Sequence, residues 1–227
     1  MHCDAEGSST FTQVIPAQAG THRTGTPNAE ARLQPPDDQR LMDITETLYV
    51  ATREAWRAWL AAHHETTSEI WLVSYRQHVG RPSVPYNDAV EEALCFGWID
   101  STRKGIDDER FAQRYTPRRP TSGYSQLNKE RLARLLDRDR VVASVAEAVC
   151  DVRAEDFHIP DDIRAALQRE AGAWDFFQST SPSYQRIRAA YVDGARAQPD
   201  VFAKRLAHLV DKCAAGKQFG YGIESYY

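Results

Sequence analysis

The pattern of hydrophobic and polar positions predicts helices along much of the chain. The tryptophans and the leucine of WRAWL, residues 56–60, recur at i, i+3 and i+4, which places them on one core-facing stripe of a helix. Thr52 precedes this stripe and can accept a hydrogen bond from a backbone N–H as its N-cap. Asn87 can cap a second helix that ends at Gly97, since glycine tolerates the positive φ that follows a helix end.

Two other stretches have the patterns of strands. Residues 69–76, EIWLVSYR, form a short apolar run with β-branched and aromatic side chains, which predicts a central strand buried on both faces. Residues 98–103 and 111–116 flank a GIDD turn, and the side chains of the second segment alternate between the two faces of a strand. The simplest interpretation of these two segments is a β-hairpin.

The pattern after the hairpin is helical. A polar loop leads into a leucine-bearing helix that Ser125 or Asn128 can cap, and beyond about Val141 further helices are expected. They lie near residues 141–150, 160–170, 181–195 and 199–215. We therefore predict an α+β fold. Residues 42–140 form a small antiparallel sheet packed with helices, and residues 141–227 form a helical C-terminal subdomain.

Residues 1–41 have a different composition from the rest of the chain. They are rich in Gly, Pro, Ser, Thr and Gln and show neither helical nor strand periodicity, so we expect a disordered leader. Its VIPAQAGTHR segment resembles the conceptual translation of dispersed repeats in proteobacterial genomes. The hypothesis is that translation starts at Met42, where globular patterning begins; a genuine flexible tail is the alternative.

Charge and length exclude some classes of protein. The 227-residue chain has a formal net charge of -4, so binding to nucleic acid or to anionic lipid would need a local basic patch. No stretch approaches the roughly 20 apolar residues of a membrane helix, and the N-terminus lacks the pattern of an export signal. We therefore expect a cytoplasmic protein without membrane insertion.

No pattern of reactive residues identifies a chemical reaction. The four cysteines lie far apart, without the short spacing of a zinc site or a redox dithiol, and Cys95 on an apolar helix stripe is expected to be buried and inert. The sequence also lacks a Gly-rich phosphate loop and a catalytic triad. We predict no metal, no cofactor and no catalytic residue, and the balance is against an enzyme.

The clearest electrostatic feature is a basic segment between Ser101 and Arg140. Eleven basic and six acidic residues give it a net charge of +5 in an otherwise acidic chain. A solvated face is one explanation. The other is an anion pocket at PRRPTSGYSQLN, where two guanidiniums, hydroxyl groups and an amide precede a helix N-terminus. Asp100 could orient Arg118 or Arg119 there, accept a proton from a ligand, or simply fix the loop to the sheet.

Three blocks of sequence carry a resemblance to a known family. YNDAVEEALCFGWIDSTRK, RYTPRRPTSGYSQLNKERLARLL and FFQSTSPSYQRIRAAYV with GKQFGY together resemble the YdeI/OmpD-associated family, also labelled bacteriocin-protection proteins, over about Leu48 to Tyr221. The sequence departs from the family pattern at Tyr124, where tryptophan is usual, and at RAQPD. The family name implies a role in resistance to antimicrobial peptides and an association with a porin.

These observations predict a non-enzymatic binding protein, related to stress or antimicrobial-peptide resistance, with an anion-recognising basic loop. An anionic small molecule or peptide is the expected ligand. The alternatives are a nucleic-acid-binding protein that uses the basic hairpin and helix, and an enzyme of unknown reaction. The expected ligand-binding residues are Trp98, Asp100, Arg118, Arg119, Ser122, Tyr124, Ser125 and Asn128.

Overall fold

The computed structural model describes residues 44–119, 121–152 and 154–220. These residues belong to one compact unit. The predicted leader at residues 1–41 and the proposed start at Met42 lie outside the described residues.

A four-stranded sheet forms the centre of the first half of this unit. Its strands are β1 (Thr47–Leu48), β2 (Ile70–Tyr75), β3 (Trp98–Gly105) and β4 (Arg110–Pro117), in the order β1-β2-β4-β3. The central strand and the hairpin were predicted correctly. The sheet is mixed rather than purely antiparallel, because the two-residue β1 pairs in parallel with β2 while the other pairings are antiparallel.

Helices make up most of the remaining structure. They are α1 (Arg53–His63), α2 (Tyr86–Cys95), α3 (Gln126–Asp137), α4 (Ala143–Ala148), α5 (Asp161–Arg169), α6 (Ala173–Ser179), α7 (Pro182–Asp193) and α8 (Pro199–Ala214), with a short 3-10 turn η2 at Gln77–Val79. The predicted α+β class is confirmed. The pattern did not predict α6, a short helix between two expected ones.

Local capping explains where several helices begin and end. Thr52 accepts a hydrogen bond from the Ala55 N–H at the start of α1, and Ser125 does the same for Asn128 at the start of α3. Gly97 follows α2 with a φ of 71°, as predicted. The predicted cap at Asn87 was wrong, because α2 already begins at Tyr86 after Pro85 and no side chain caps it.

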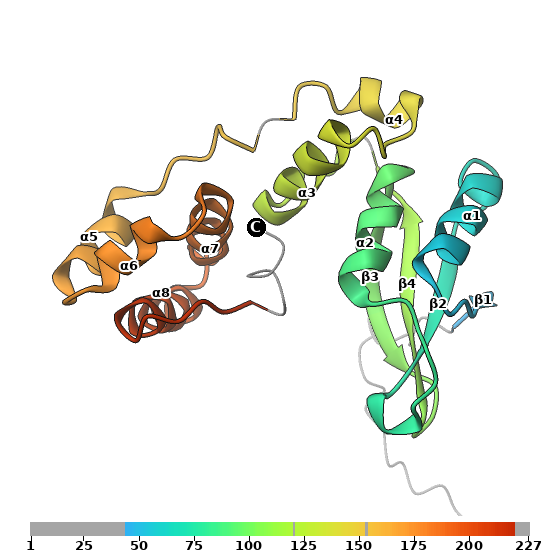
Figure 1. Cartoon of the computed structure of the whole chain (residues 1–227), viewed down its shortest axis with the longest axis horizontal. Helices are drawn as coiled ribbons and strands as arrows, with labels where there is room; N and C mark the ends of the chain where they lie inside the picture. Colours follow the sequence, from blue (N-terminus) through green and yellow to red (C-terminus); the bar gives the residue numbers. More distant parts are fainter. Residues whose placement is uncertain (1–43, 120, 153, 221–227) are drawn as a thin grey trace, which may run out of the picture. The chain divides into compact units, whose positions relative to one another are not determined.

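The described residues form three hydrophobic clusters, and the two larger ones hold the helices in place. In the first, α1 and α2 lie side by side on one face of the sheet (Figure 1), and the Trp56 indole N–H donates to the Ala89 carbonyl oxygen at 3.0 Å. The second cluster joins α5, α6, α7 and α8 through residues such as Phe177 and Leu209. Glu130 of α3 connects the two halves, since both of its carboxylate oxygens accept hydrogen bonds from Arg186 of α7, at 2.6 and 2.9 Å.

Candidate functional site

The arginine turn singled out in the sequence lies between β4 and α3. Arg118 Nη2 donates to the carbonyl oxygens of Ser122 and Gly123, at 3.1 and 2.7 Å, and its guanidinium lies 3.8 Å from the centre of the Tyr124 ring. Arg119 is exposed beside it. The guanidinium of Arg118 therefore holds the turn in shape by binding its backbone.

Three other predicted site residues are placed in three different surroundings. Trp98 is in the core, with 1% of its surface exposed, and its indole N–H donates to the His64 carbonyl oxygen. Asn128 is buried on α3 and accepts a hydrogen bond from Arg131. Asp100 accepts a hydrogen bond from the Tyr86 hydroxyl at 2.8 Å and forms no ion pair with Arg118 or Arg119 within the described chain. These three residues thus have different partners, and a role of the predicted set in ligand binding stays a prediction.

A large cavity contains only Asp100 of that predicted set. Its volume is about 1230 Å³, slightly above the about 300–1,000 Å³ of typical small-molecule sites. Its floor is the sheet face that α1 and α2 cover further along, represented by Leu72, Gln113 and Tyr115. The N-terminal turn of α2, the start of α3, the helices α7 and α8 and the segment at Phe219 form its walls.

A β-bulge directs two charged side chains of β3 toward this cavity. Asp100 and Arg103 are three positions apart, which in a regular strand would place them on opposite faces. The register shifts between them, however, so that Asp100 pairs with Tyr115 and Arg103 pairs with Gln113, which share one face of β4. Both charges therefore line the cavity.

Arg131 is the most deeply buried of the arginines that line this cavity. It has 4% of its surface exposed, and its Nη1 and Nη2 donate to the side-chain oxygens of Asn128 and Asn87, at 3.0 and 2.6 Å. Both partners are neutral, and no carboxylate of the described residues forms an ion pair with it. The guanidinium has more N–H donors than these two bonds use. Arg131 is therefore a positively charged group that two amides fix in place at the wall of the cavity.

Two tyrosines, Tyr86 and Tyr115, line the cavity together with these charged groups. Burial raises the pKa of Tyr86 to about 12, with a further contribution from the neighbouring Asp100 carboxylate, while the positive charge of Arg131 opposes the rise. Burial likewise raises the pKa of Tyr115. The Asp100 charge raises this pKa further, and the Arg131 charge lowers it. Both hydroxyls are therefore protonated near neutral pH and can serve as hydrogen-bond donors.

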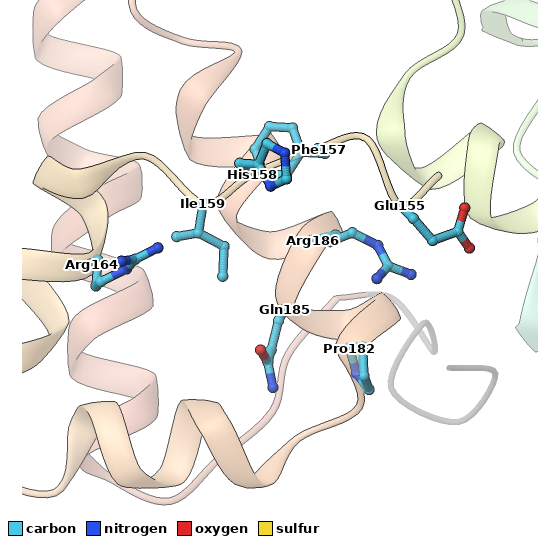
Figure 2. A pocket seen from close by; sticks show the side chains of 8 residues that line it. All are labelled: Glu155, Phe157, His158, Ile159, Arg164, Pro182, Gln185 and Arg186. Atoms are coloured by element: carbon cyan, nitrogen blue, oxygen red, sulfur yellow. The ribbon is translucent and has the colours of Figure 1, made fainter. Parts of the chain in front are cut away.

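A second, smaller pocket lies beside α7. Its volume is about 260 Å³, and Figure 2 shows the Arg186 guanidinium directed toward the segment that carries Glu155. Arg186 already makes two hydrogen bonds with Glu130, and these bonds raise the pKa of its guanidinium. Because its central cation is neutralised by a carboxylate, this pocket is a weaker candidate for binding an anion.

The sequence analysis missed the main residues of the large cavity. Arg131 was counted only as one member of the basic segment, although it follows Leu127 by four positions and precedes Leu135 by four. An arginine on an apolar helix stripe is a usable signal, because a buried charge is expensive unless it is paired. Tyr86 and His208, which also line the cavity, carried no comparable signal.

The described residues contain no group of three or more His, Cys, Asp or Glu side chains that could hold a metal ion. Within the same part of the chain, no helix has the length and apolar character needed to span a bilayer.

Two family models match the chain, the first up to the end of α4 and the second after it. Residues 48–148 match a model described as "Domain of unknown function (DUF8412)". Residues 156–216 match the model described as "Bacteriocin-protection, YdeI or OmpD-Associated", which confirms the family resemblance in this segment. Searches of curated proteins and of solved structures found no match. Both matched segments contribute walls to the large cavity, with Asp100 and Arg131 in the first and Tyr191 and His208 in the second.

Proposed function

We propose that this chain, which carries a YdeI/OmpD-associated domain at residues 156–216, is a binding protein for an organic anion, and that the ligand occupies the large cavity. The observation that carries the proposal is Arg131, a buried guanidinium whose partners are two amide oxygens. A carboxylate or phosphate on the ligand supplies the ion-pair partner that Arg131 lacks among the described residues.

The energetics favour an anion at this position. A buried charge loses much of its hydration, and neutral hydrogen-bond partners compensate for that loss only in part. Charge-assisted hydrogen bonds from a guanidinium to a carboxylate or phosphate are shorter and stronger than bonds between neutral groups. Because Asn87 and Asn128 already fix the orientation of the Arg131 fork, little further side-chain entropy is lost when the ligand binds.

The walls of the cavity indicate the rest of the ligand. Arg103 is exposed and stacks on Phe111 with its guanidinium 3.7 Å from the ring centre, so it is a second positive group at the sheet side. Aromatic rings of Tyr115, Tyr191 and Phe219 line much of the remainder. An anion with an apolar or aromatic body fits this composition.

The predicted basic loop remains a separate hypothesis for the same function. Arg119 is exposed, and Arg118 is bound to backbone carbonyls of its own turn. A cytoplasmic location and a role in resistance to antimicrobial peptides are likewise proposals, the second supported by the printed family description. That description also mentions OmpD, so an association with a porin belongs with the same proposals.

A thermal-shift screen of carboxylates, phosphorylated metabolites, nucleotides and short oligonucleotides tests this function. A ligand of the cavity should stabilise the wild type and the Arg138→Ala variant, because Arg138 is exposed at the end of α3, and should lose its effect on Arg131→Gln. Removal of one partner of a buried charge pair costs about 2–5 kcal/mol of binding free energy, or roughly 30-fold or more in Kd.

The same screen separates the competing hypotheses. A ligand that loses its effect on the Arg118→Ala/Arg119→Ala protein but keeps it on Arg131→Gln would place the site on the basic loop and refute the cavity. An oligonucleotide whose affinity falls steeply with salt would instead support nucleic-acid binding through the basic segment.

A further inference from the structure

The large cavity contains a carboxylate as well as guanidiniums, and this carboxylate is incompletely satisfied. Asp100 Oδ2 accepts a hydrogen bond from Tyr86 at 2.8 Å, and Asp100 makes no other hydrogen bond or ion pair within the described chain. A carboxylate has two oxygens and room for several donors. Its Oδ1 is therefore available to a donor that enters the cavity.

Three arginines line the cavity, Arg103, Arg131 and Arg188, and none of them forms an ion pair with this carboxylate. Arg103 lies three positions away along β3, but its guanidinium stacks on Phe111. Arg131 is held by Asn87 and Asn128, which keeps it outside the ion-pair distance of Asp100. Opposite charges that face one cavity usually collapse into a salt bridge unless other contacts hold them apart. Here the stacking and the two amides do so, and both charges are preserved for a ligand.

The two charges lie close enough to act on the same groups. The hydroxyls of Tyr86 and Tyr115 respond to the negative charge of Asp100 and to the positive charge of Arg131 in opposite directions. Tyr115 is also the direct cross-strand partner of Asp100. Asp100 and Arg131 also line the same cavity, so one ligand in it can contact both the carboxylate and the guanidinium.

We propose that the ligand is a zwitterion, with an amine that donates to Asp100 and an acidic group that accepts from Arg131. A free amino acid with an apolar or aromatic side chain and a short peptide with free termini share this chemistry. The Tyr86 hydroxyl orients the Asp100 carboxylate, and the aromatic walls contact the apolar body. This inference rests on the proposed binding function and specifies the class of ligand.

Matched ligands that differ only in the amine provide the test. Isothermal titration calorimetry compares phenylalanine with 3-phenylpropionate, and the dipeptide Gly-Phe with its N-acetyl derivative. The wild type should bind the amine-bearing member of at least one pair about tenfold or more tightly, because the amine donates to the partly buried Asp100 carboxylate and the analogue leaves that carboxylate unpaired. The pair that shows this preference indicates whether the ligand is a free amino acid or a short peptide.

Two variants with the same charge change assign the preference to a residue. Asp100→Asn should reduce the preference for the amine to about twofold or less, while Asp108→Asn, at an exposed carboxylate in the hairpin turn, should keep it. Tyr86→Phe provides a second perturbation of the same carboxylate and should weaken the preference without removing it. Circular dichroism of each variant verifies folding, and the hydroxyl removed in Tyr86→Phe belongs to a half-exposed side chain.

The outcomes distinguish this inference from the function on which it rests. Equal binding of both members of each pair, or binding of the amine-free members alone, overturns the zwitterion while the anion site stands. A preference that persists in Asp100→Asn also overturns it. If neither member binds and other anions of the screen act equally on wild type and Arg131→Gln, the proposed function fails first.

Discussion

Glu92 of α2 is the centre of the largest buried charge network, and its removal is the most direct test of how this fold is held together. Its side chain is fully buried, and its two carboxylate oxygens accept hydrogen bonds from Arg53, Arg57 and Arg140. Burial alone would raise the pKa of Glu92, but the hydrogen bonds from Arg57 and Arg53 and the charges of Arg53 and Arg140 hold it below its ordinary value. The carboxylate is therefore charged at neutral pH and joins α1, α2 and the segment after α3.

The expected effect of Glu92→Ala follows from the exposure of the partners. Removal of one member of a buried ion pair costs about 3–5 kcal/mol, because the remaining charges lose their partner. Arg53 and Arg57 are 27% and 29% exposed, and Arg53 keeps Asp88 and Glu91 as partners, so water and these carboxylates compensate in part. We expect Glu92→Ala to lower the free energy of unfolding by about 3 kcal/mol, the lower limit of this range. In a domain of this size, this loss lowers Tm by about 6–12 °C.

Urea unfolding followed by circular dichroism measures this loss. The control is Asp162→Ala, which removes a carboxylate that Arg196 binds with two hydrogen bonds at 2.9 and 3.0 Å, but with both side chains about half exposed. An exposed pair contributes about 1 kcal/mol or less. If the two substitutions lower the free energy of unfolding equally, burial of Glu92 contributes nothing special and the reasoning is refuted.

Two further predictions concern titration and reactivity. Because the folded-state pKa of Glu92 is lowered, its stabilisation is complete above the pKa of the unfolded chain and is lost as the pH falls through the folded value. The difference in unfolding free energy between wild type and Glu92→Gln should therefore narrow as the pH falls below about 4.3, the ordinary pKa of a glutamate, and a constant difference would contradict this. Burial raises the pKa values of Cys95 and Cys213 to about 11, so in the native protein iodoacetamide should label the exposed Cys150 well before either of them, as peptide mapping would show.

Features of the fold that depend on neighbouring residues could be predicted from the sequence. Thr52 caps α1 and Gly97 ends α2 because each acts on backbone groups within a few positions. The apolar run at residues 69–76 predicted β2, since an interior strand must be apolar on both faces. The two-residue β1 could not be predicted, because it exists only through its pairing with a strand more than twenty positions away.

The cavity depends on contacts that no local pattern describes. Asn87 has the side chain of an N-cap, but its amide oxygen accepts a hydrogen bond from Arg131, 44 positions later. Asp100 was singled out, and Arg118 or Arg119 was offered as its partner on the expectation that the hairpin and the arginine turn converge. The β-bulge in β3 instead turns it toward Tyr86 and the cavity. A register shift of this kind follows from the pairing of whole strands and leaves no mark in the residues themselves.

The position of α3 has a thermodynamic consequence. Glu130 accepts two hydrogen bonds from Arg186 of α7, whereas the adjacent Arg131 lines the large cavity. An occupant that contacts cavity walls from both halves connects the two larger hydrophobic clusters. Its binding free energy therefore stabilises the attachment of one half to the other by mass action. By reciprocity, the factor by which the occupant strengthens this attachment equals the factor by which the attachment strengthens binding of the occupant.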